Sequence, residues 1–585
     1  MKTIITALNS KFIHLSLAPW YLKVTCGNEC GEVKVREFTI NEKINNILST
    51  LLFDHADVYA FSCYIWNIEY VLKLASDIKK VKPCAKIILG GPEVSYDAKE
   101  IIKKYSYIDY IISGEGETAF KQLLTAINQN NNTIMKTISG LTYKDEDKSV
   151  SNCCKLERLP DSIPSPYIKE MLENMENRIV YFESSRGCPF SCSYCLSSTC
   201  EGVRYFSLER VKSELLKLIK NGVHQIKFVD RTFNCNKKRA IEIFKFIIEH
   251  QNDNINFHFE VAADLFDEEM FAILQDAPAG LIQFEIGIQS TNEDTLMAVN
   301  RKTDIKKVLN NIKRLQKPGN IHIHVDLIAG LPLETYKIFQ KSFNDAYLLC
   351  AHNLQLGFLK LLKGSGIREN KEQFGYIYRD YPPYEILSNN FISFYELTKL
   401  NDIEEVLDRY YNSGRFVQSL KFITSKIFSN PFEFYYEFSK YYRIEGYFDK
   451  PASSQSLYDI LLAFLKTKVD MTHYELLNEL MKFDYLRTNN TRSLPKNLKR
   501  IQESSFHQRC FDFLKDENNI AFYLPAQVGF SPKQVFKNVH FEMFSYDILS
   551  TQRCPNVILF DHTNKDKVTG LSDFHIVVLS ATVER

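Results

Sequence analysis

An alternation of short apolar runs with amphipathic stretches constrains the fold more than any other feature of the sequence. Apolar runs of strand length cover residues 3–8, 58–64, 86–91 and 110–113, and residues 70–81 carry apolar side chains at helical spacing. Strands that alternate with helices in this way form a parallel sheet with helices on both faces. We therefore expect a doubly wound α/β domain over residues 1–135.

The same alternation returns further along the chain. Helical stretches such as 208–222 and 237–250 separate six strand-like runs at residues 180–185, 226–230, 257–263, 284–290, 323–332 and 354–362. A strand–helix unit repeated six times predicts a partial (β/α)6 barrel of the TIM type over residues 176–365. In such a barrel the chemistry takes place at the carboxyl ends of the strands.

The remaining segments have different patterns. Residues 136–175 are polar and proline-rich, with a hairpin-like stretch at 142–154, and we expect a linker there. From residue 366 to residue 585 the pattern is largely helical, with dense aromatic residues at 430–448. We expect a mostly helical C-terminal domain with an aromatic core, which is a candidate substrate cap.

Length, charge and cysteine usage bound the class of protein. The 585 residues are too many for one core and indicate about three to four domains. A formal net charge of +1 gives no overall attraction to nucleic acid. No apolar run approaches the roughly 18–20 residues that span a bilayer, and the N-terminus lacks a signal peptide's apolar stretch. The 14 cysteines are mostly scattered singly, which suits a reducing compartment, so we expect a cytoplasmic protein.

Three cysteines, Cys188, Cys192 and Cys195, have the spacing C-x-x-x-C-x-x-C directly after the first strand of the predicted barrel. A disulfide would leave one of the three thiols unpaired, and a reducing compartment disfavours it. A structural zinc site needs four ligands, so zinc stays open with Cys200 as the fourth. An iron–sulfur cluster is the leading interpretation, because thiolates are its standard ligands.

The cysteine spacing, with the aromatic Tyr194 before the last cysteine, closely resembles the signature of the radical SAM superfamily. The resemblance implies that the three thiolates hold a 4Fe–4S cluster, whose fourth iron takes the amino and carboxylate groups of S-adenosylmethionine. It also implies contacts to S-adenosylmethionine from side chains in or after the later strands: Glu260, Gln289, Ser290, Arg301, Asp230 and Asp326. Residues 356–361 would pack against adenine. Each polar residue in this set has an alternative role as a core group satisfied by the backbone.

A second group of candidates follows the strands of the first domain, because ligands of such sheets bind beyond the carboxyl ends of the strands. The segments GGPEVS (90–95) and ISGEGE (112–117) resemble the cobalamin-binding, Rossmann-like domain that precedes many radical enzymes. The resemblance implies cobalamin contacts from Asn9, Ser10, Lys11, Ser62, Tyr64, Trp66, Asn67, Gly90, Gly91, Pro92, Glu93, Gly114, Glu115, Gly116 and Glu117.

One motif of other cobalamin proteins is missing. The chain has no D-x-H-x-x-G sequence, so the resemblance implies a corrinoid without a lower histidine ligand, and we expect a structural role for His14. A domain that has lost its corrinoid stays open. The C-terminal part, with YYNSGRF (410–416) and VILFDH (557–562), resembles an uncharacterised family attached to a subset of these enzymes.

The combined resemblance implies a cobalamin-dependent radical SAM enzyme. The leading hypothesis is methyl transfer from methylcobalamin to an unactivated carbon of a substrate radical. The alternatives are cyclisation, ring contraction or another rearrangement, and a non-catalytic corrinoid or iron–sulfur carrier or sensor; a zinc-bound nucleic-acid module fits the near-zero charge poorly. A small molecule, peptide, lipid or modified nucleobase remains open as substrate, and flavodoxin or ferredoxin is the expected type of electron donor.

Overall fold

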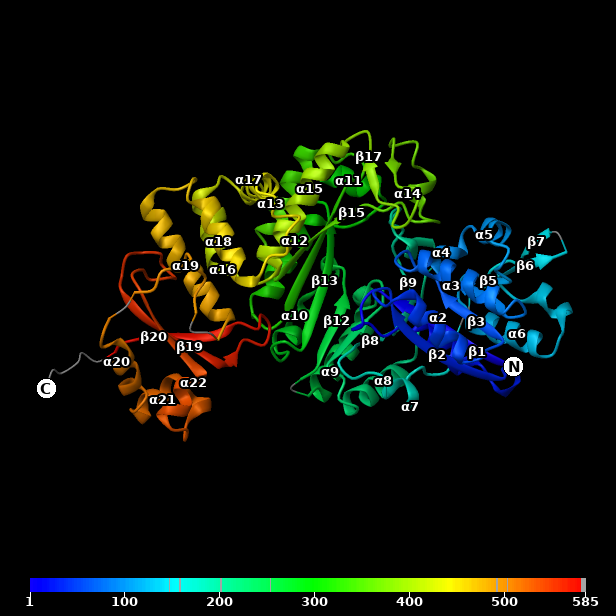
Figure 1. Cartoon of the computed structure of the whole chain (residues 1–585), viewed down its shortest axis with the longest axis horizontal. Helices are drawn as coiled ribbons and strands as arrows, with labels where there is room; N and C mark the ends of the chain where they lie inside the picture. Colours follow the sequence, from blue (N-terminus) through cyan, green and yellow to red (C-terminus); the bar gives the residue numbers. More distant parts are fainter. Residues whose placement is uncertain are drawn as a thin grey trace.

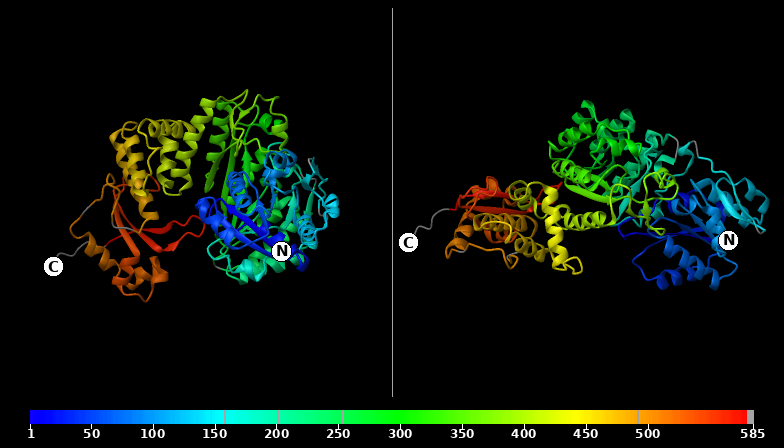
Figure 2. Two further views of the ribbon diagram at one scale, coloured as in Figure 1. Left: turned by 45° about the vertical axis from the view of Figure 1, so that its right-hand side comes forward. Right: turned by 90° about the horizontal axis from the view of Figure 1, so that it is seen from above.

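The computed structural model describes residues 1–146, 148–156, 159–199, 202–252, 254–490, 493–501 and 503–579. Figure 1 shows three parts in a row: an N-terminal α/β domain in blue and cyan, a central α/β domain in green, and a C-terminal part in yellow to red. The central domain separates the other two, as the views of Figure 2 also show.

The N-terminal domain is built on a seven-stranded sheet of order β2-β1-β3-β4-β5-β6-β7. Four strands lie where the sequence predicts them: β1 (Lys2–Asn9), β3 (Val58–Ser62), β4 (Lys86–Gly90) and β5 (Tyr110–Ile112). Neighbouring residues of β1 enter different cores, because Ile4 packs with α2 (Ile44–Phe53) and α3 (Ile68–Val81), whereas Ile5 packs with α6 (Glu117–Asn128). Helices therefore cover both faces, as expected for a doubly wound sheet.

Three strands of this sheet were not assigned to the domain in advance, although a hairpin-like stretch was expected at 142–154. The parallel edge strand β2 (Glu32–Thr39) alternates charged and apolar residues and is only partly buried. The antiparallel hairpin β6 (Leu141–Asp145) and β7 (Lys148–Ser151) falls in the predicted linker, where its Leu141 and Tyr143 enter the core beside β5. The N-terminal domain therefore extends to Ser151, and the connector is shorter than 136–175.

The central domain contains six parallel strands in sequential order. They match the six predicted runs: β8 (Ile179–Phe182), β11 (Gln225–Phe228), β12 (Asn256–Glu260), β13 (Ile282–Gln289), β14 (His322–Ala329) and β15 (Asn353–Phe358). Helices α8 (Leu208–Lys220), α9 (Lys237–His250), α10 (Glu268–Gln275), α12 (Ile305–Gln316) and α13 (Tyr336–Tyr347) connect them. Among the described strands β8 and β15 are the sheet's edges, so no closed barrel forms.

The two faces of this sheet differ in chemistry. Phe259 and Phe284 pack with Phe244 of α9, and Phe228 packs against Phe259 with ring centroids 4.5 Å apart. The alternating positions carry polar side chains such as Lys227 and Glu285, which form an ion pair of 2.9 Å. The opposite face of the sheet from the helices is thus polar, although most of it is shielded from solvent.

The C-terminal part begins with helices that have an aromatic core, as predicted. Tyr410, just after α15 (Phe394–Leu407), is fully buried against Phe438 and Tyr442 of α17 (Pro431–Ile444), and the hydroxyls of Tyr410 and Tyr442 are 2.7 Å apart. Buried rings of α18 (Ser454–Leu465) and α19 (Met471–Thr488) join the same core. A three-stranded antiparallel sheet follows: β18 (Val539–Phe544), β19 (Asn556–Lys565) and β20 (Ser572–Val577). The sequence analysis missed this sheet, which follows a C-terminal region that is otherwise mainly helical, as predicted.

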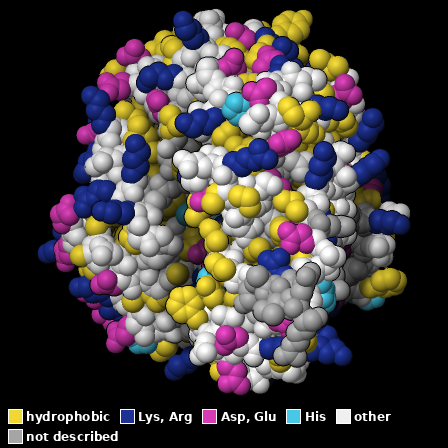
Figure 3. Space-filling view, turned by 90° about the vertical axis from the view of Figure 1, so that its left-hand side faces the viewer, with side chains coloured by type: hydrophobic (Ala, Val, Ile, Leu, Met, Phe, Trp, Pro, Cys, Tyr) yellow, Lys and Arg dark blue, Asp and Glu magenta, His cyan; other side chains and the backbone are white. Residues whose placement is uncertain are grey.

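The helical part covers one edge of the central sheet. The side-chain amide of Asn412 accepts from the backbone N–H of Leu354 and donates to its carbonyl, at 2.9 and 3.0 Å, and so pairs with the free edge of β15. Basic and acidic side chains are interspersed on the molecular face seen from this end, in keeping with the net charge of +1 (Figure 3). In the part of the chain that the structure describes, no helix combines the length and apolarity needed to cross a membrane.

Candidate active site

The cysteine loop lies at the carboxyl end of the first strand of the central sheet. It connects β9 (Ser185–Gly187) with β10 (Val203–Tyr205), and Cys188 follows β9 directly. Two backbone hydrogen bonds of 2.9 Å hold its middle: Ser193 N donates to Val299 O, and Ile367 N donates to Ser193 O. The loop is therefore fixed from both sides by segments distant in sequence.

The three thiols of this loop are of the kind that holds an iron–sulfur cluster. Within the described ranges, no three His, Cys, Asp or Glu side chains converge closely enough to hold one metal ion. Thiolates of a 4Fe–4S cluster bind different irons and so lie farther apart than ligands of one ion. Cys200, the fourth ligand of the zinc alternative, lies outside the described residues.

Arg301 connects the cysteine loop to the central sheet. Its guanidinium donates to the Tyr194 hydroxyl at 3.1 Å and to the carbonyl of Gly287 in β13, and it lies 3.9 Å from the Cys192 sulfur. Burial raises the pKa of the Cys192 thiol, and the nearby Arg301 charge opposes that shift. A thiol beside a fixed guanidinium is suited to act as a thiolate ligand.

A cavity of about 220 Å³ opens beside this loop, at the carboxyl ends of β12, β13 and β14. Four residues predicted to contact S-adenosylmethionine line it: Glu260, Gln289, Arg301 and Asp326. Gln289 Oε1 and Arg301 Nε are buried and have no partner among the described residues. Polar groups in this state favour a polar ligand, because a buried donor or acceptor without a partner is costly.

The sequence analysis missed several residues of the cavity wall. Arg231, Asp264, Glu285 and Lys302 also line it. Arg231 and Lys302 each neighbour a residue that had been singled out, and Glu285 interrupts an apolar strand just as Glu260 does. The same signal of a charge within a buried strand could have identified Glu285.

Two other predicted contacts do not line the cavity, and their contact with S-adenosylmethionine stays a prediction. Ser290 is fully buried and donates to Glu334. Asp230 is also buried and accepts from the backbone N–H of Ser184 at 2.9 Å and from its hydroxyl at 2.6 Å, so it supports the start of the cysteine loop. The apolar residues of 356–361, among them Leu356, Leu359 and Leu361, belong to the core and do not line the cavity.

The residues after the strands of the N-terminal sheet fall into two groups. In the first group, the stacked rings of Tyr64 and Trp66 lie with centroids 4.4 Å apart, and Trp66 is 44% exposed. Beside them Gly91 has φ +111°, and a Cβ there would lie 2.6 Å from the Cys63 carbonyl, so only glycine fits. This group also contains Ser10, Lys11, Ser62, Gly90, Pro92, Gly114 and Gly116. For all of its members, contact with cobalamin stays a prediction.

The members of the second group bind other protein residues, and their contact with cobalamin stays a prediction. Asn9 and Asn67 brace the loops: Asn9 bonds to Glu37, and Asn67 bonds to the carbonyls of Leu8 and Ser62. The three acidic residues bind the central domain instead. Glu93 pairs with Lys363 at 3.2 Å, and the other two, Glu115 and Glu117, pair with arginines of the β9–β10 hairpin.

Comparison with known families places these domains. Three family models match: the B12 binding domain over residues 3–124, the radical SAM superfamily over residues 182–346, and a protein of unknown function, DUF4080, over residues 372–560. The chain combines a B12-binding domain with a radical SAM domain. The first domain type implies cobalamin, and the second implies a 4Fe–4S cluster and S-adenosylmethionine, so the three predicted cofactors are confirmed at the level of the domains.

Individual curated proteins are similar to this chain. The cobalamin-dependent radical SAM methyltransferase TokK of Streptomyces tokunonensis is 29% identical over 344 residues, which are 54% of this chain and 49% of TokK. The anaerobic magnesium-protoporphyrin IX monomethyl ester cyclase of Rubrivivax gelatinosus is 26% identical over 318 residues, 52% of this chain and 56% of the cyclase. The chain thus spans about half the length of these curated relatives.

A solved structure extends the likeness to most of the chain. The cobalamin-dependent S-adenosylmethionine radical enzyme OxsB, with aqua-cobalamin bound, superposes with a TM-score of 0.56 and covers 91% of this chain and 84% of OxsB. The sequence identity is 15%, so the comparison shows a shared fold.

Proposed function

We propose that this protein is a cobalamin-dependent radical SAM methyltransferase that methylates an unactivated carbon. The observation that carries the proposal is the apposition of the two candidate cofactor loops. The Tyr96 hydroxyl, which follows β4, lies 3.2 Å from the Thr199 hydroxyl in the cysteine loop, and Glu93, also after β4, pairs at 3.2 Å with Lys363, which follows β15. The carboxyl ends of both sheets therefore border one interface, where a methyl donor and a substrate radical can meet.

The bound cofactors would supply reductive cleavage of S-adenosylmethionine to a 5′-deoxyadenosyl radical, which abstracts a substrate hydrogen, and a methyl group from methylcobalamin. Cys188, Cys192 and Cys195 would hold the cluster. Arg301 and Gln289 would orient the methionyl end of S-adenosylmethionine with the polar atoms that lack partners, and Glu260 would accept hydrogen bonds from its ribose. On the corrinoid side, the Tyr64–Trp66 pair offers an apolar platform where a histidine ligand is missing.

Several finer assignments belong to the same proposal. We infer that the six sequential parallel strands form a partial (β/α)6 barrel, since the connection after each strand returns the chain to the same end of the sheet before the next strand begins. Residues 363–392 are the better candidate for a substrate cap than the helices, because Tyr376 and Asn389 bind the carbonyl of Gly330 at the carboxyl end of β14, at 3.1 and 2.9 Å. Thiolate-held clusters suit the reducing cytoplasm, and flavodoxin or ferredoxin is the proposed electron donor.

A cyclase is the second candidate, favoured by the likeness to the Rubrivivax gelatinosus enzyme. Both candidates need the same cofactors and differ in the fate of the substrate radical. A methyltransferase must also regenerate methylcobalamin from a second S-adenosylmethionine, which a cyclase does not. Formation of methylcobalamin by the protein therefore separates the two.

The proposal is tested by anaerobic reconstitution with iron, sulfide and hydroxocobalamin. We expect about four irons per chain and about one corrinoid, and after reduction S-adenosylmethionine should be cleaved and methylcobalamin should form. The Cys192→Ala variant should lose the cluster absorbance and the cleavage, whereas Cys350→Ala, an exposed cysteine far from the loop, should keep both. Intact cleavage in Cys192→Ala would contradict the cluster assignment, and iron without corrinoid would contradict methyl transfer.

A further inference from the structure

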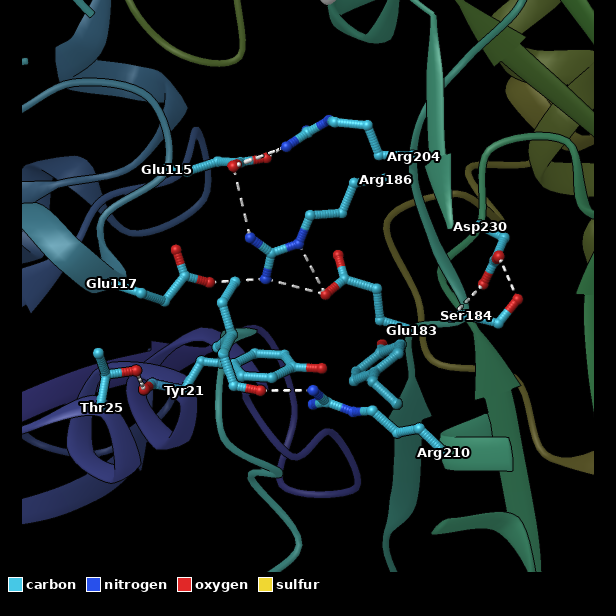
Figure 4. A network of polar contacts seen from close by, with 12 residues as sticks. Tyr21, Thr25, Glu115, Glu117, Glu183, Ser184, Arg186, Arg204, Arg210 and Asp230 are labelled. Atoms are coloured by element: carbon cyan, nitrogen blue, oxygen red, sulfur yellow. Dashed lines mark hydrogen bonds and ion pairs between the residues drawn. The ribbon is translucent and has the colours of Figure 1, made fainter. Parts of the chain in front are cut away.

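A buried arginine projects from the cysteine loop's own strand into the B12-binding domain. Arg186 lies in β9, two residues before Cys188, and its side chain is 10% exposed. Figure 4 shows its guanidinium among three carboxylates. It donates to Glu117 of the B12-binding domain at 2.6 Å and to Glu183 of its own domain at 3.0 Å, and it lies 3.6 Å from Glu115.

A second arginine completes the contact. Arg204 is the cross-strand partner of Arg186 in the β9–β10 pair and donates to Glu115 at 3.0 Å, so Glu115 lies between the two guanidinium groups. The Arg186 guanidinium also lies 5.3 Å from the centroid of Tyr21 in α1 (Ala18–Thr25), a distance typical of cation–π contact. The hairpin that carries the cysteine loop is thus held by two separate elements of the other domain.

The backbone transmits this contact to the cluster ligands. Gly187, between Arg186 and Cys188, has φ +94°, and a Cβ there would lie 2.2 Å from the carbonyl of Gly202. The hairpin is therefore closed tightly at the point where the loop begins. On the other domain, Glu115 lies in the loop after β5 and Glu117 begins α6, at the carboxyl edge where a corrinoid would bind. A shift of either loop moves the other through Arg186.

A guanidinium is the group suited to this task. It presents several donors in a rigid fork and can bind two carboxylates at fixed angles, which a lysine ammonium cannot. Charge pairs of this kind fix orientation and register at an interface more than they add affinity. The opposite edge of the radical SAM sheet has a matching contact, because Lys363, which follows β15, donates to the carbonyl of Glu93 at 3.1 Å.

We propose that Arg186 is a positioning residue that sets the cysteine loop and the corrinoid-side loop at the separation needed for methyl transfer between them. This inference rests on the proposed function. The GEGE segment (114–117) then serves to align the two domains. Loss of Arg186 should uncouple two reactions that share one S-adenosylmethionine site. Cleavage at the cluster should persist, whereas transfer of the sulfonium methyl to reduced cobalamin should fail.

The test compares Arg186→Gln and Arg186→Lys with Arg210→Gln in the full chain, loaded with cluster and cobalamin. Arg210 is a matched control, because it is a part-buried arginine whose 3.0 Å bond to Glu214 stays within the radical SAM domain. Iron, corrinoid and 5′-deoxyadenosine formation without substrate should stay within about twofold of wild type in all variants. Methylcobalamin formation from reduced protein and S-adenosylmethionine, followed by absorbance, should fall at least tenfold in Arg186→Gln, recover partly in Arg186→Lys, and be unchanged in Arg210→Gln.

Each outcome bears on a different claim. Methylcobalamin formation at the wild-type rate in Arg186→Gln would overturn the inference, and so would loss of iron in that variant, which indicates a role in folding alone. Absence of methylcobalamin in the wild type would instead overturn the proposed function. In that case hydrogen exchange still tests the alignment: Arg186→Gln should increase exchange in both residues 113–120 and 186–195, and an unchanged pattern would overturn the inference.

Discussion

At the scale of residues, two neighbouring carboxyl groups of the cavity have opposite properties. Glu260 and Glu285 are paired in register across β12 and β13. Burial raises the pKa of Glu260 to about 7, and the charge of Arg231 only partly offsets it. Burial also acts on Glu285, but hydrogen bonds from His258 and Lys227, both 2.9 Å, outweigh it and bring the pKa to about 2. One carboxyl therefore titrates near neutrality while its neighbour stays ionised.

This difference predicts a pH dependence of S-adenosylmethionine binding. The ionised carboxylate of Glu260 accepts hydrogen bonds from ribose more strongly than the neutral acid, so affinity should fall about tenfold as the pH is lowered from 8 to 6. Glu260→Gln should bind more weakly at pH 8 and show no such dependence in equilibrium dialysis. Equal pH dependence in both proteins would remove Glu260 from the site.

The raised pKa of Glu260 also affects the stability of the protein without bound ligand. A higher pH favours binding but lowers this stability. A carboxyl whose folded pKa lies above its unfolded value contributes stability at low pH, and that contribution is lost as the pH rises through about 7. Glu260→Gln should therefore gain stability over wild type at pH 8, by up to about 3 kcal/mol, and little at pH 5. Thermal melts at the two pH values measure the difference, with Glu209→Gln, an exposed residue of α8, as the control.

At the scale of elements, the end of strand β13 departs from regular geometry where it meets the cavity. The register with β14 shifts between Gly287 and Gln289, and Gln289 has φ +67°. A non-glycine residue in this conformation is strained, and such strain collects at functional sites. The bulge directs the Gln289 amide back over Gly287, where a Cβ would lie 2.1 Å from Gln289 Nε2.

Gly287→Ala should therefore displace the Gln289 side chain without unfolding the strand. We expect affinity for S-adenosylmethionine to fall about tenfold, while the cluster content and melting temperature change little. Gly357→Ala is a suitable control, since Gly357 is a strand residue of the same sheet without positive φ, and its Cβ would meet only the Leu327 carbonyl, at the ordinary contact distance of 3.4 Å. An unchanged affinity in Gly287→Ala would mean that Gln289 does not hold the ligand.

The sequence predicts those elements whose signal is local. All six strands of the radical SAM sheet and the cysteine loop were predicted, because apolar runs and cysteine spacing are read directly from neighbouring residues. Edge strands such as β2 and β18 were missed, since their polar face removes the continuous apolar run. The partners of Glu115 and Glu117 could not be predicted either, because a charge pair between residues some 70 to 90 positions apart depends on the docking of two domains.

At the scale of the whole molecule, the radical SAM domain and the C-terminal helices share one continuous core. Phe343 of α13 is fully buried, with ring centroids 5.4 Å from Phe432 and 5.8 Å from Tyr435 of α17. Tyr347 and Tyr411 continue this contact at 4.8 Å. Because Asn412 also binds the free edge of β15, the helices are part of the folded unit of the radical SAM domain and are not a separate domain attached to it.

We therefore expect a chain that ends at residue 365 to lose cooperative folding of the radical SAM domain. The cut would expose the apolar face of α13 and the edge of β15, and exposed surfaces of this kind drive aggregation. The full chain carrying Phe343→Ala should lose about 3–5 kcal/mol of stability, because that ring packs against the helices on the far side of the cut. Denaturant unfolding followed by circular dichroism measures both, with a chain ending at residue 579 as control. A cooperative transition of wild-type midpoint in the 365-residue chain would show instead that the two parts fold independently, and the C-terminal helices would then be free to move relative to the cofactor site.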